Sequence, residues 1–420
     1  MSKAINPFKP TAGMNPPELI GRDAVLDDFA EALENGPGAP DRLMRISGVR
    51  GTGKTVLLNA LGDLARKKGF EVVDVASNAG FCSRILKALQ RNVRLESMSI
   101  SPSILGVSLG SVEVSKSASH LGEAMYDAAK RGGLLITLDE IQDASTEEMR
   151  ELGNEMQLLI RQGANVAFAF AGLPTSVDGV VVDDALTFLQ RAKHIELTRL
   201  SDFEVGGSFE DTMRRAGKEL DEGVAELLTK ASAGYPFMVQ LVGYYAWQVA
   251  ARSGSESVSE EAARKGVQAA LDSFNAMVIA PALRRVSERQ FQYLAAMAQC
   301  EGGEITNGDI AKKMGLPANK VGSYRKRLID TGLIEPAGYG CVSRSKLIGW
   351  RVVDEDRLSI LIRQLLAIDI MVDAIGKQRK GSRDDRRRII QTKVELPAVL
   401  WLQTGVSQLV SLGSLVHTIR

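Results

Sequence analysis

The stretch ISGVRGTGKT, residues 46 to 55, combines the residue types that hold a phosphate group in proteins. It has the spacing G-x-x-x-x-G-K-S/T, after an apolar run and before a segment with helical spacing. Glycines let backbone N–H groups turn toward an anion, a lysine neutralises β- and γ-phosphate charge, and a threonine hydroxyl ligates Mg²⁺. The alternative is a glycine-rich turn between a strand and a helix with an exposed lysine. The residues predicted to bind the nucleotide are Gly48, Val49, Arg50, Gly51, Thr52, Gly53, Lys54, Thr55 and Val56, with Thr55 also on the metal.

A second pair of reactive residues ends the apolar run in GGLLITLDEIQDA. Asp139 and Glu140 stand where a strand would end, and ligands of open α/β sheets bind at the carboxyl ends of the strands. We expect Asp139 to hold Mg²⁺, through water, and Glu140 to orient or polarise the water that attacks ATP. By itself, the pattern also fits a buried strand that meets a solvated loop. Together with the glycine-rich stretch, it predicts an ATPase whose cofactors are ATP and Mg²⁺.

The elements that must position these residues follow from the pattern between Leu19 and about His194, where apolar runs alternate with helical spacing. Such alternation predicts a parallel sheet flanked by helices. Residues 97–117, SMSISPSILGVSLGSVEVSKS, interrupt the pattern and are predicted to form an inserted hairpin. From Ser201 to about Arg285 the spacing is almost entirely helical. The predicted strands are Leu43–Ser47, Glu71–Val75, Leu134–Leu138, Val166–Ala171 and His194–Leu197.

Composition limits the classes of protein that need to be considered. The chain has 420 residues and a net charge of +1, so we expect two or three domains. The near-neutral charge excludes a protein whose whole surface is built to hold nucleic acid, but it leaves room for a local basic patch. The three cysteines and three histidines are dispersed, which argues against a disulfide framework or a zinc site and favours a reducing, cytoplasmic setting. Residues 1–18 are predicted to form an extended, proline-rich arm, without the apolar core of a secretory signal.

Residues 19 to 343 resemble an AAA+-type P-loop ATPase of the branch related to replication initiators and archaeal-type ATPases, which borders the STAND ATPases. The segment LIGRDAVLDDF resembles the box before the phosphate loop of those families, which implies that Ile20, Gly21 and Arg22 help to hold the adenine. The segment ASAGYPFMVQ resembles the G-x-P element of the helical lid, which implies that Tyr235 and Pro236 lie near the base. Helix capping by the first segment, and a proline in a first helical turn, are the ordinary structural alternatives. The implied architecture is an α/β P-loop NTPase core over residues 19–200 and an α-helical lid over residues 201–285.

Two departures from the family pattern concern the rate of hydrolysis. The segment FAGLPTSV lacks the early polar sensor of many AAA+ proteins, and Thr175 is its best substitute. The lid segment GYPFMVQ has no arginine where initiator-type ATPases keep their second sensor. We therefore expect hydrolysis to be slow or conditional. Arg191, just before the last strand, resembles an arginine finger, which implies a homo-oligomer; the alternative is a surface arginine.

The order helix, helix, helix, hairpin over residues 286–345 resembles a winged helix-turn-helix domain. Its third helix lies in PANKVGSYRKRLIDTG, and Ile310, Val321, Leu328 and Ile334 are predicted to be core residues. Double-stranded DNA is the expected partner, but winged helices also dock proteins, and both possibilities stay open. The residues expected to contact DNA are Lys320, Ser323, Tyr324, Arg325 and Arg327, with Asn319 beside them and Lys312 and Lys313 near phosphates.

Residues 346–420 do not continue this resemblance, since the expected strand and closing helix are replaced by an apolar stretch and the basic run KQRKGSRDDRRR. We expect the basic run to be solvated. Residues 396–419 carry no charge, but their polar residues make a membrane span unexpected. A shifted reading frame is a hypothesis for the abrupt change, and translation of the other frames tests it. For the whole chain, we expect an ATPase that couples nucleotide state to DNA binding; the alternatives are a STAND-like signalling switch and a nucleotide-binding scaffold.

Overall fold

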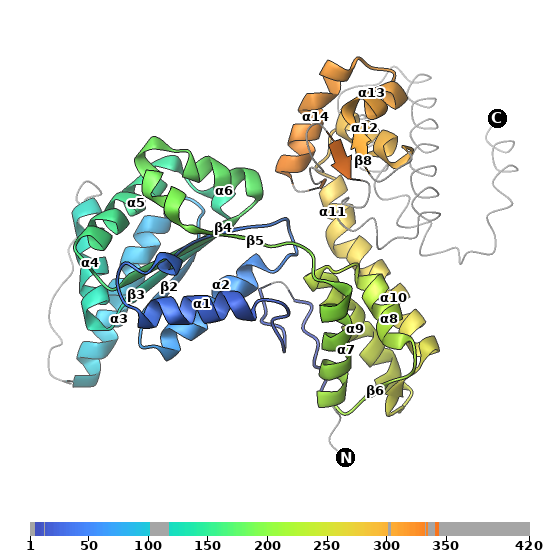
Figure 1. The fold of residues 1–420 in the computed structure, drawn as a ribbon, viewed down its shortest axis with the longest axis horizontal. Helices are drawn as coiled ribbons and strands as arrows, with labels where there is room; N and C mark the ends of the chain where they lie inside the picture. The colour runs from blue at the N-terminus through green and yellow to red at the C-terminus, as the bar shows by residue number, and fades with distance from the viewer. Residues whose placement is uncertain are drawn as a thin grey trace, which may run out of the picture. The chain divides into compact units, whose positions relative to one another are not determined.

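The computed structural model describes residues 5–11, 13–100, 117–300, 304–331, 333–334 and 341–343 (Figure 1). These residues belong to two units, the first within Met1–Phe274 and the second within Asn275–Arg420. Within the described ranges, no helix is both long and apolar enough to cross a bilayer.

A five-stranded parallel sheet forms the centre of the first unit, in the order β2-β3-β4-β1-β5. Its inner strands β3 and β4 are nearly continuous apolar runs because helices cover both faces of the sheet. The predicted parallel sheet is confirmed, and each predicted strand agrees with the structure to within one residue at either end. The strands are β1 (Leu43–Ser47), β2 (Glu71–Ala76), β3 (Leu134–Asp139), β4 (Val166–Gly172) and β5 (Lys193–Glu196).

Successive side chains of each strand point into two different cores. In β4, Phe168 and Phe170 join the core beneath α3, α4, α5 and α6, whereas Ala167 and Ala169 join the core beneath α1 and α2. The small alanine side chains allow α2, which carries the glycine-rich stretch at its start, to pack close to the sheet. The helices are α1 (Asp23–Glu34), α2 (Lys54–Lys67), α3 (Phe81–Ile100), α4 (Ser117–Arg131), α5 (Thr146–Arg161) and α6 (Pro174–Val181).

The hairpin predicted for residues 97–117 is wrong at both of its ends. Helix α3 continues through Ile100, and α4 already begins at Ser117. The short alternation Ser-Met-Ser-Ile at residues 97–100 does not end α3, because extending an existing helix costs less than starting a new element. The rest of the predicted hairpin, residues 101–116, lies outside the described residues.

Four helices follow β5 in the first unit, as the helical spacing predicts: α7 (Asp202–Arg215), α8 (Val224–Ser232), α9 (Pro236–Arg252) and α10 (Glu260–Phe274). A capping box of Ser201 and Glu204 starts α7. Helices α9 and α10 approach closely at Gly266, where an added Cβ would lie 2.5 Å from the backbone of Ala246. The short strands β6 (Glu219–Leu220) and β7 (Ser257–Val258) pair in parallel beside them.

The second unit contains α11 (Ala280–Leu283), α12 (Glu288–Ala298), α13 (Asn307–Met314) and α14 (Ala318–Asp330). The strands β8 (Glu304–Thr306) and β9 (Cys341–Ser343) pair antiparallel. A Ser287–Gln290 capping box starts α12, and a Thr306–Asp309 box starts α13. The four predicted core residues of this unit are confirmed, since Ile310, Val321, Leu328 and Ile334 are all buried.

Candidate nucleotide site and candidate nucleic-acid surface

The glycine-rich stretch lies between β1 and α2, at the carboxyl edge of the sheet. Gly51 and Gly53 have φ angles of 82° and 94°, in the left-handed region that favours glycine. At Gly48, an added Cβ would lie 3.1 Å from the Leu197 carbonyl oxygen and closer still to the Thr52 hydroxyl. The strand, loop and helix therefore have the arrangement that a phosphate-binding loop requires.

Lys54 is the first residue of α2, and its ammonium group turns back into the loop. The Nζ atom donates hydrogen bonds to the carbonyl oxygens of Gly48, at 2.9 Å, and Val49, at 3.1 Å. Burial lowers the pKa of the Lys54 ammonium, while the carboxylates of Glu140 and Asp139 oppose that change. The loop thus holds the buried Lys54 ammonium group by hydrogen bonds to its own carbonyl oxygens, near the carboxylates of Glu140 and Asp139.

Thr55 and Asp139 meet although 84 residues separate them in the chain. The Thr55 hydroxyl donates a 2.5 Å hydrogen bond to Asp139 Oδ2, and the Glu140 amide donates a 2.8 Å bond to Asp139 Oδ1. A hydroxyl and a carboxylate are hard oxygen donors of the kind that Mg²⁺ takes in protein sites. The two residues predicted to hold the metal therefore lie together, and their chemistry fits it.

Glu140 lies directly after β3 in an unusual backbone conformation. Its φ and ψ angles are 57° and 49°, in the left-handed region, where a non-glycine residue costs about 1 to 3 kcal/mol. The turn that follows, Ile141–Asp143, is a single 3₁₀ turn. Such strain at the end of a buried strand marks a residue whose orientation is set by its surroundings.

The residues predicted to hold the base meet around the segment after β5. Arg22 donates to the carbonyl oxygen of Thr198 at 3.3 Å. Gly21 has a φ of 64°, and an added Cβ would lie 2.5 Å from the carboxylate of Glu204. Half-buried Ile20 precedes them. The predicted box before the phosphate loop therefore packs against residues 198–204.

The start of α9 contacts both this segment and the phosphate loop. The Leu200 amide donates to the Gly234 carbonyl oxygen at 2.9 Å, and the guanidinium of Arg199 lies 5.5 Å from the ring centre of Tyr235. The Cδ1–Cε1 edge of that ring lies beside Gly51, whose added Cβ would be 3.0 Å from Cε1, and Pro236 begins the helix. Sequence analysis missed Arg199, and only its place three residues after the last strand could have indicated it.

Two residues of the proposed hydrolytic set stand apart from the others. Arg191 is exposed at the end of the 3₁₀ segment Asp184–Arg191, and Thr175 is exposed in the first turn of α6. Among the hydrogen bonds and ion pairs of the described residues, none joins either side chain to Lys54, Asp139 or Glu140. A role for Arg191 at this chain's own nucleotide therefore has no support from these contacts.

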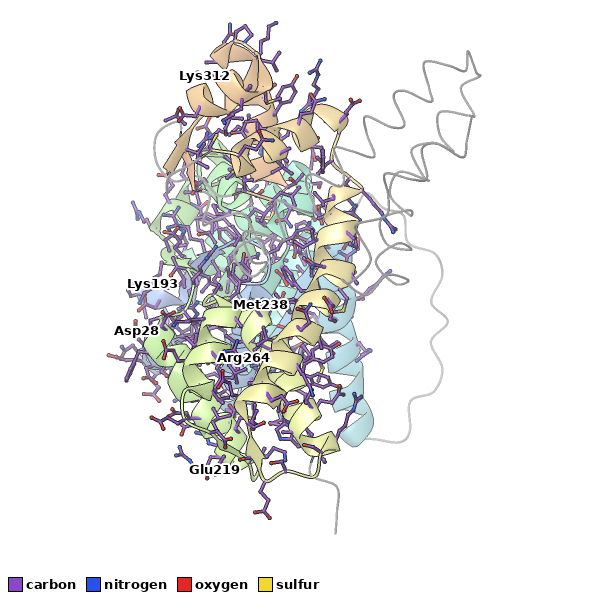
Figure 2. All side chains as sticks on the ribbon, turned by 90° about the vertical axis from the view of Figure 1, so that its right-hand side faces the viewer. Asp28, Lys193, Glu219, Met238, Arg264 and Lys312 are labelled. Atoms are coloured by element: carbon purple, nitrogen blue, oxygen red, sulfur yellow. The ribbon has the colours of Figure 1, made fainter. Side chains whose placement is uncertain are left out.

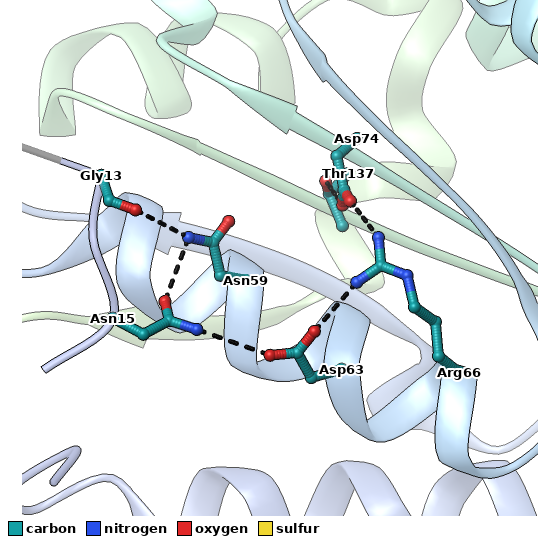
Figure 3. Close-up of polar contacts among 7 residues, drawn as sticks. All are labelled: Gly13, Asn15, Asn59, Asp63, Arg66, Asp74 and Thr137. Carbon is teal, nitrogen blue, oxygen red and sulfur yellow. Dashed lines mark hydrogen bonds and ion pairs between the residues drawn. The ribbon is translucent and has the colours of Figure 1, made fainter. Parts of the chain in front are cut away.

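In residues 5–11 and 13–18, the predicted arm has no helix or strand, and it is attached to the first unit at two places. At its start, buried Phe8 packs on Gly243 of α9, and Asn6 donates to the Tyr244 carbonyl oxygen at 2.9 Å. Further along, Asn59 of α2 donates to the Gly13 carbonyl oxygen at 3.2 Å. Figure 3 shows the polar chain that continues inward from this point to β3, through Asn15, Asn59, Asp63, Arg66, Asp74 and Thr137.

Helix α14 of the second unit carries the residues predicted to contact DNA. Four of them follow the spacing i, i+3, i+4 and i+7, which puts them on one face of the helix. On that face, Tyr324 is half-buried and the other three are exposed. Asn319 is exposed beside them, and Lys312 and Lys313 are exposed on α13, where Figure 2 labels Lys312. The four residues are Lys320, Ser323, Tyr324 and Arg327.

Arg325 does not share this face with the other four residues that are expected to contact DNA. It lies at the spacing i, i+4, i+7 with Val321 and Leu328, which are both buried, and it is itself half-buried. Burial raises the pKa of the Tyr293 hydroxyl, and the nearby Arg325 guanidinium opposes that rise. The helical period therefore turns Arg325 toward the core of the unit.

Comparisons with known proteins agree with this fold. Residues 39–181 match the family model "AAA domain", and residues 276–343 match "Domain of unknown function (DUF8462)". No curated protein sequence matches the chain.

Two solved structures with the same architecture come from archaea. The ORC2 protein of Aeropyrum pernix, in ADPNP–ADP complexes, is 17% identical, with 86% of this chain and 98% of that chain covered and a TM-score of 0.56. The Walker-type ATPase PABY2304 of Pyrococcus abyssi is 15% identical, with 80% and 97% covered and a TM-score of 0.58. Identities this low show a shared fold. Together with the family match, they show that the first unit contains an AAA+ ATPase-like P-loop domain.

Proposed function

We propose that this protein is a slow, Mg²⁺-dependent ATPase that couples its nucleotide state to the binding of double-stranded DNA. The observation that carries the proposal is the hydrogen bond from the Thr55 hydroxyl to Asp139 Oδ2, at 2.5 Å. It joins the phosphate loop to the acidic end of β3, and these two oxygen donors are the ones that would hold Mg²⁺. A turn without a nucleotide role has no need to bring these two groups together.

Each residue of the site has a chemical task in this proposal. Bound Mg²⁺ would neutralise charge that develops on the phosphates, and Thr55 and Asp139 would hold it. Lys54 exchanges the carbonyl oxygens of Gly48 and Val49 for phosphate oxygens, which compensates its burial. Glu140 accepts a proton from, or orients, the attacking water.

The base would be held by the residues that meet beside the loop. Ile20, Gly21 and Arg22 approach residues 198–204 from one side, and Tyr235 and Pro236 approach from the lid. Tyr235 also contacts Gly51. A movement of the lid helices would therefore change the contacts of the phosphate loop. This contact is a physical route from the bound nucleotide to the helices of the lid.

Slow turnover follows from what the sequence lacks, namely a second-sensor arginine in the lid and a polar sensor after β4. Exposed Arg191 would act as a finger on the nucleotide of a neighbouring copy, so the active form would be a homo-oligomer. Hydrolysis would then depend on assembly.

The second unit would bind DNA as a winged helix. Its support is the order of α12, α13, α14 and the β8–β9 pair, with one exposed basic face on α14. Lys320 and Arg327 would contact bases or phosphates, and Ser323 and Tyr324 would lie between them. Arg325 would stabilise α14 by packing on its core-facing side.

Measurement of Mg·ATP turnover by the full chain, with and without double-stranded DNA, tests the proposal. DNA should raise the rate, and omission of Mg²⁺ should abolish it. Turnover that responds to assembly but not to DNA would favour a signalling switch whose second unit docks a protein. Nucleotide binding without turnover under any condition would favour a scaffold.

A further inference from the structure

Gln142 connects the ends of two neighbouring strands at the proposed hydrolytic site. Its Nε2 atom donates a hydrogen bond to Glu140 Oε2. Its Oε1 atom accepts a 3.4 Å hydrogen bond from the amide of Leu173, directly after β4. One half-buried side-chain amide therefore joins the Glu140 carboxylate to the backbone of the adjacent strand.

The surrounding backbone is shaped to keep this amide in place. At Gly172, the last residue of β4, an added Cβ would lie 2.3 Å from Ile141 Cγ2 and 3.2 Å from Gln142 Oε1. Only a residue without a side chain lets the turn after β3 rest on β4 so closely. The Ile141 side chain is buried in the core, and the backbone of the preceding residue, Glu140, is in the left-handed region. The strained turn and the glycine together fix the position of Gln142.

We propose that Gln142 is a positioning residue for Glu140, a role that rests on the proposed ATPase function. The best substitute for a polar sensor after β4 is Thr175, and Thr175 is exposed on α6. Gln142 supplies a polar group at this place from the neighbouring strand instead. As a neutral donor, it holds one carboxylate oxygen and leaves Oε1 of Glu140 free to engage water.

The contact also gives Glu140 a link to movement at the start of α6. A shift of the Leu173 amide would change the hydrogen bond to Gln142 and, through it, the direction of the Glu140 carboxylate. Two other charged groups lie near Glu140, namely Lys54 of α2 and Asp139 of β3. Neither is altered in the experiment below, so its effects can be assigned to position 142.

The test is the substitution Gln142→Glu, which keeps the shape and the acceptor for Leu173 but puts a second carboxylate against Glu140. Like charges this close repel each other, and a carboxylate cannot donate the hydrogen bond that the amide gives. We expect kcat to fall about tenfold and ATP affinity to change less than about twofold. Gln142→Met, which removes both hydrogen bonds of the side chain, should lower kcat in the same way and leave ATP affinity within about twofold of the wild type. Gln162→Glu, at an exposed position after α5, is the matched control and should change neither.

An unchanged kcat in both variants, or an equal loss of kcat and ATP affinity, would overturn the proposal. A second readout does not need turnover. Gln142→Glu should unfold at a lower temperature than the wild type, and the added substitution Glu140→Gln should restore the unfolding temperature, because the new amide at position 140 can donate to the new carboxylate at position 142. Additive effects of the two substitutions on the unfolding temperature would overturn the proposal. A wild type without turnover would contradict the ATPase function, while a restored unfolding temperature would still support the Gln142 contact.

Discussion

The nucleotide site of the first unit and the α14 face of the second are built in different ways. In the first, the residues come from separate segments and bond to one another, as Lys54 does to Gly48 and Thr55 to Asp139. In the second, one helix presents Lys320 and its neighbours, most of them exposed, in an i, i+3, i+4, i+7 row. Convergent contacts restrict what a site can do, whereas an exposed row defines only a face. Substitutions should therefore have large and distinct effects in the first site and small, graded effects on the second.

The largest expected effect is that of Lys54→Ala. The substitution removes the charge that would meet the phosphates in a closed loop, so ATP affinity should fall at least about 100-fold, as for hydrogen bonds to charged groups. Isothermal titration of the full chain with Mg·ATP measures it. Lys67→Ala removes an exposed lysine from the last turn of the same helix and should bind like the wild type. Equal Mg·ATP affinities of Lys54→Ala and Lys67→Ala would contradict the assignment of residues 48–56 as a phosphate loop.

Substitution of Arg191 tests whether this exposed residue takes part in hydrolysis at the nucleotide site. As a finger it acts on a neighbouring copy, so Arg191→Ala should lower turnover by about tenfold or more. A mixture of Arg191→Ala with Glu140→Gln should recover part of the wild-type activity, because each copy supplies what the other lacks. Turnover that is independent of protein concentration, with no recovery on mixing, would make Arg191 a surface residue.

The smallest expected effects are on α14, where two arginines of the same helix differ in position. Arg327→Ala should reduce the log–log salt slope of DNA binding by about 0.9, the value for one lost phosphate contact. Arg325→Ala should leave that slope unchanged and lower the stability of the second unit by about 1 kcal/mol through lost packing. Fluorescence anisotropy across salt concentrations, with thermal unfolding, separates the two. Equal slopes for both variants would remove the distinction between the exposed and core-facing arginines.

The same difference explains what could be predicted from the sequence. The apolar runs were sufficient to predict the five strands, because strands that helices cover on both faces are mostly apolar. The roles of Lys54, Thr55 and Asp139 could be predicted because the binding of phosphate and metal restricts the residue types at such positions. The two-residue spacing of Arg325 and Arg327 predicts that they cannot fully share one helix face, but it does not say which of them turns toward the core.

Contacts between distant segments were also missed. The bond of Gln142 to Glu140 and Leu173 depends on how two strands end, and the anchoring of Phe8 against Gly243 joins residues far apart in the chain. Neither leaves a local pattern. The hairpin expected over residues 97–117 was wrong at its ends because local alternation was given more weight than the helices on either side.

The most direct test of the account is a comparison of ATP binding and turnover in Glu140→Gln. This substitution preserves the shape of the side chain but removes the carboxylate that orients water. Mg·ATP affinity should stay within about twofold of the wild type, while turnover should fall at least about 100-fold, as for a lost general base. Glu147→Gln, at an exposed position in the first turn of α5, should retain both properties. Turnover in Glu140→Gln equal to that of Glu147→Gln would contradict the assignment of hydrolysis to the end of β3.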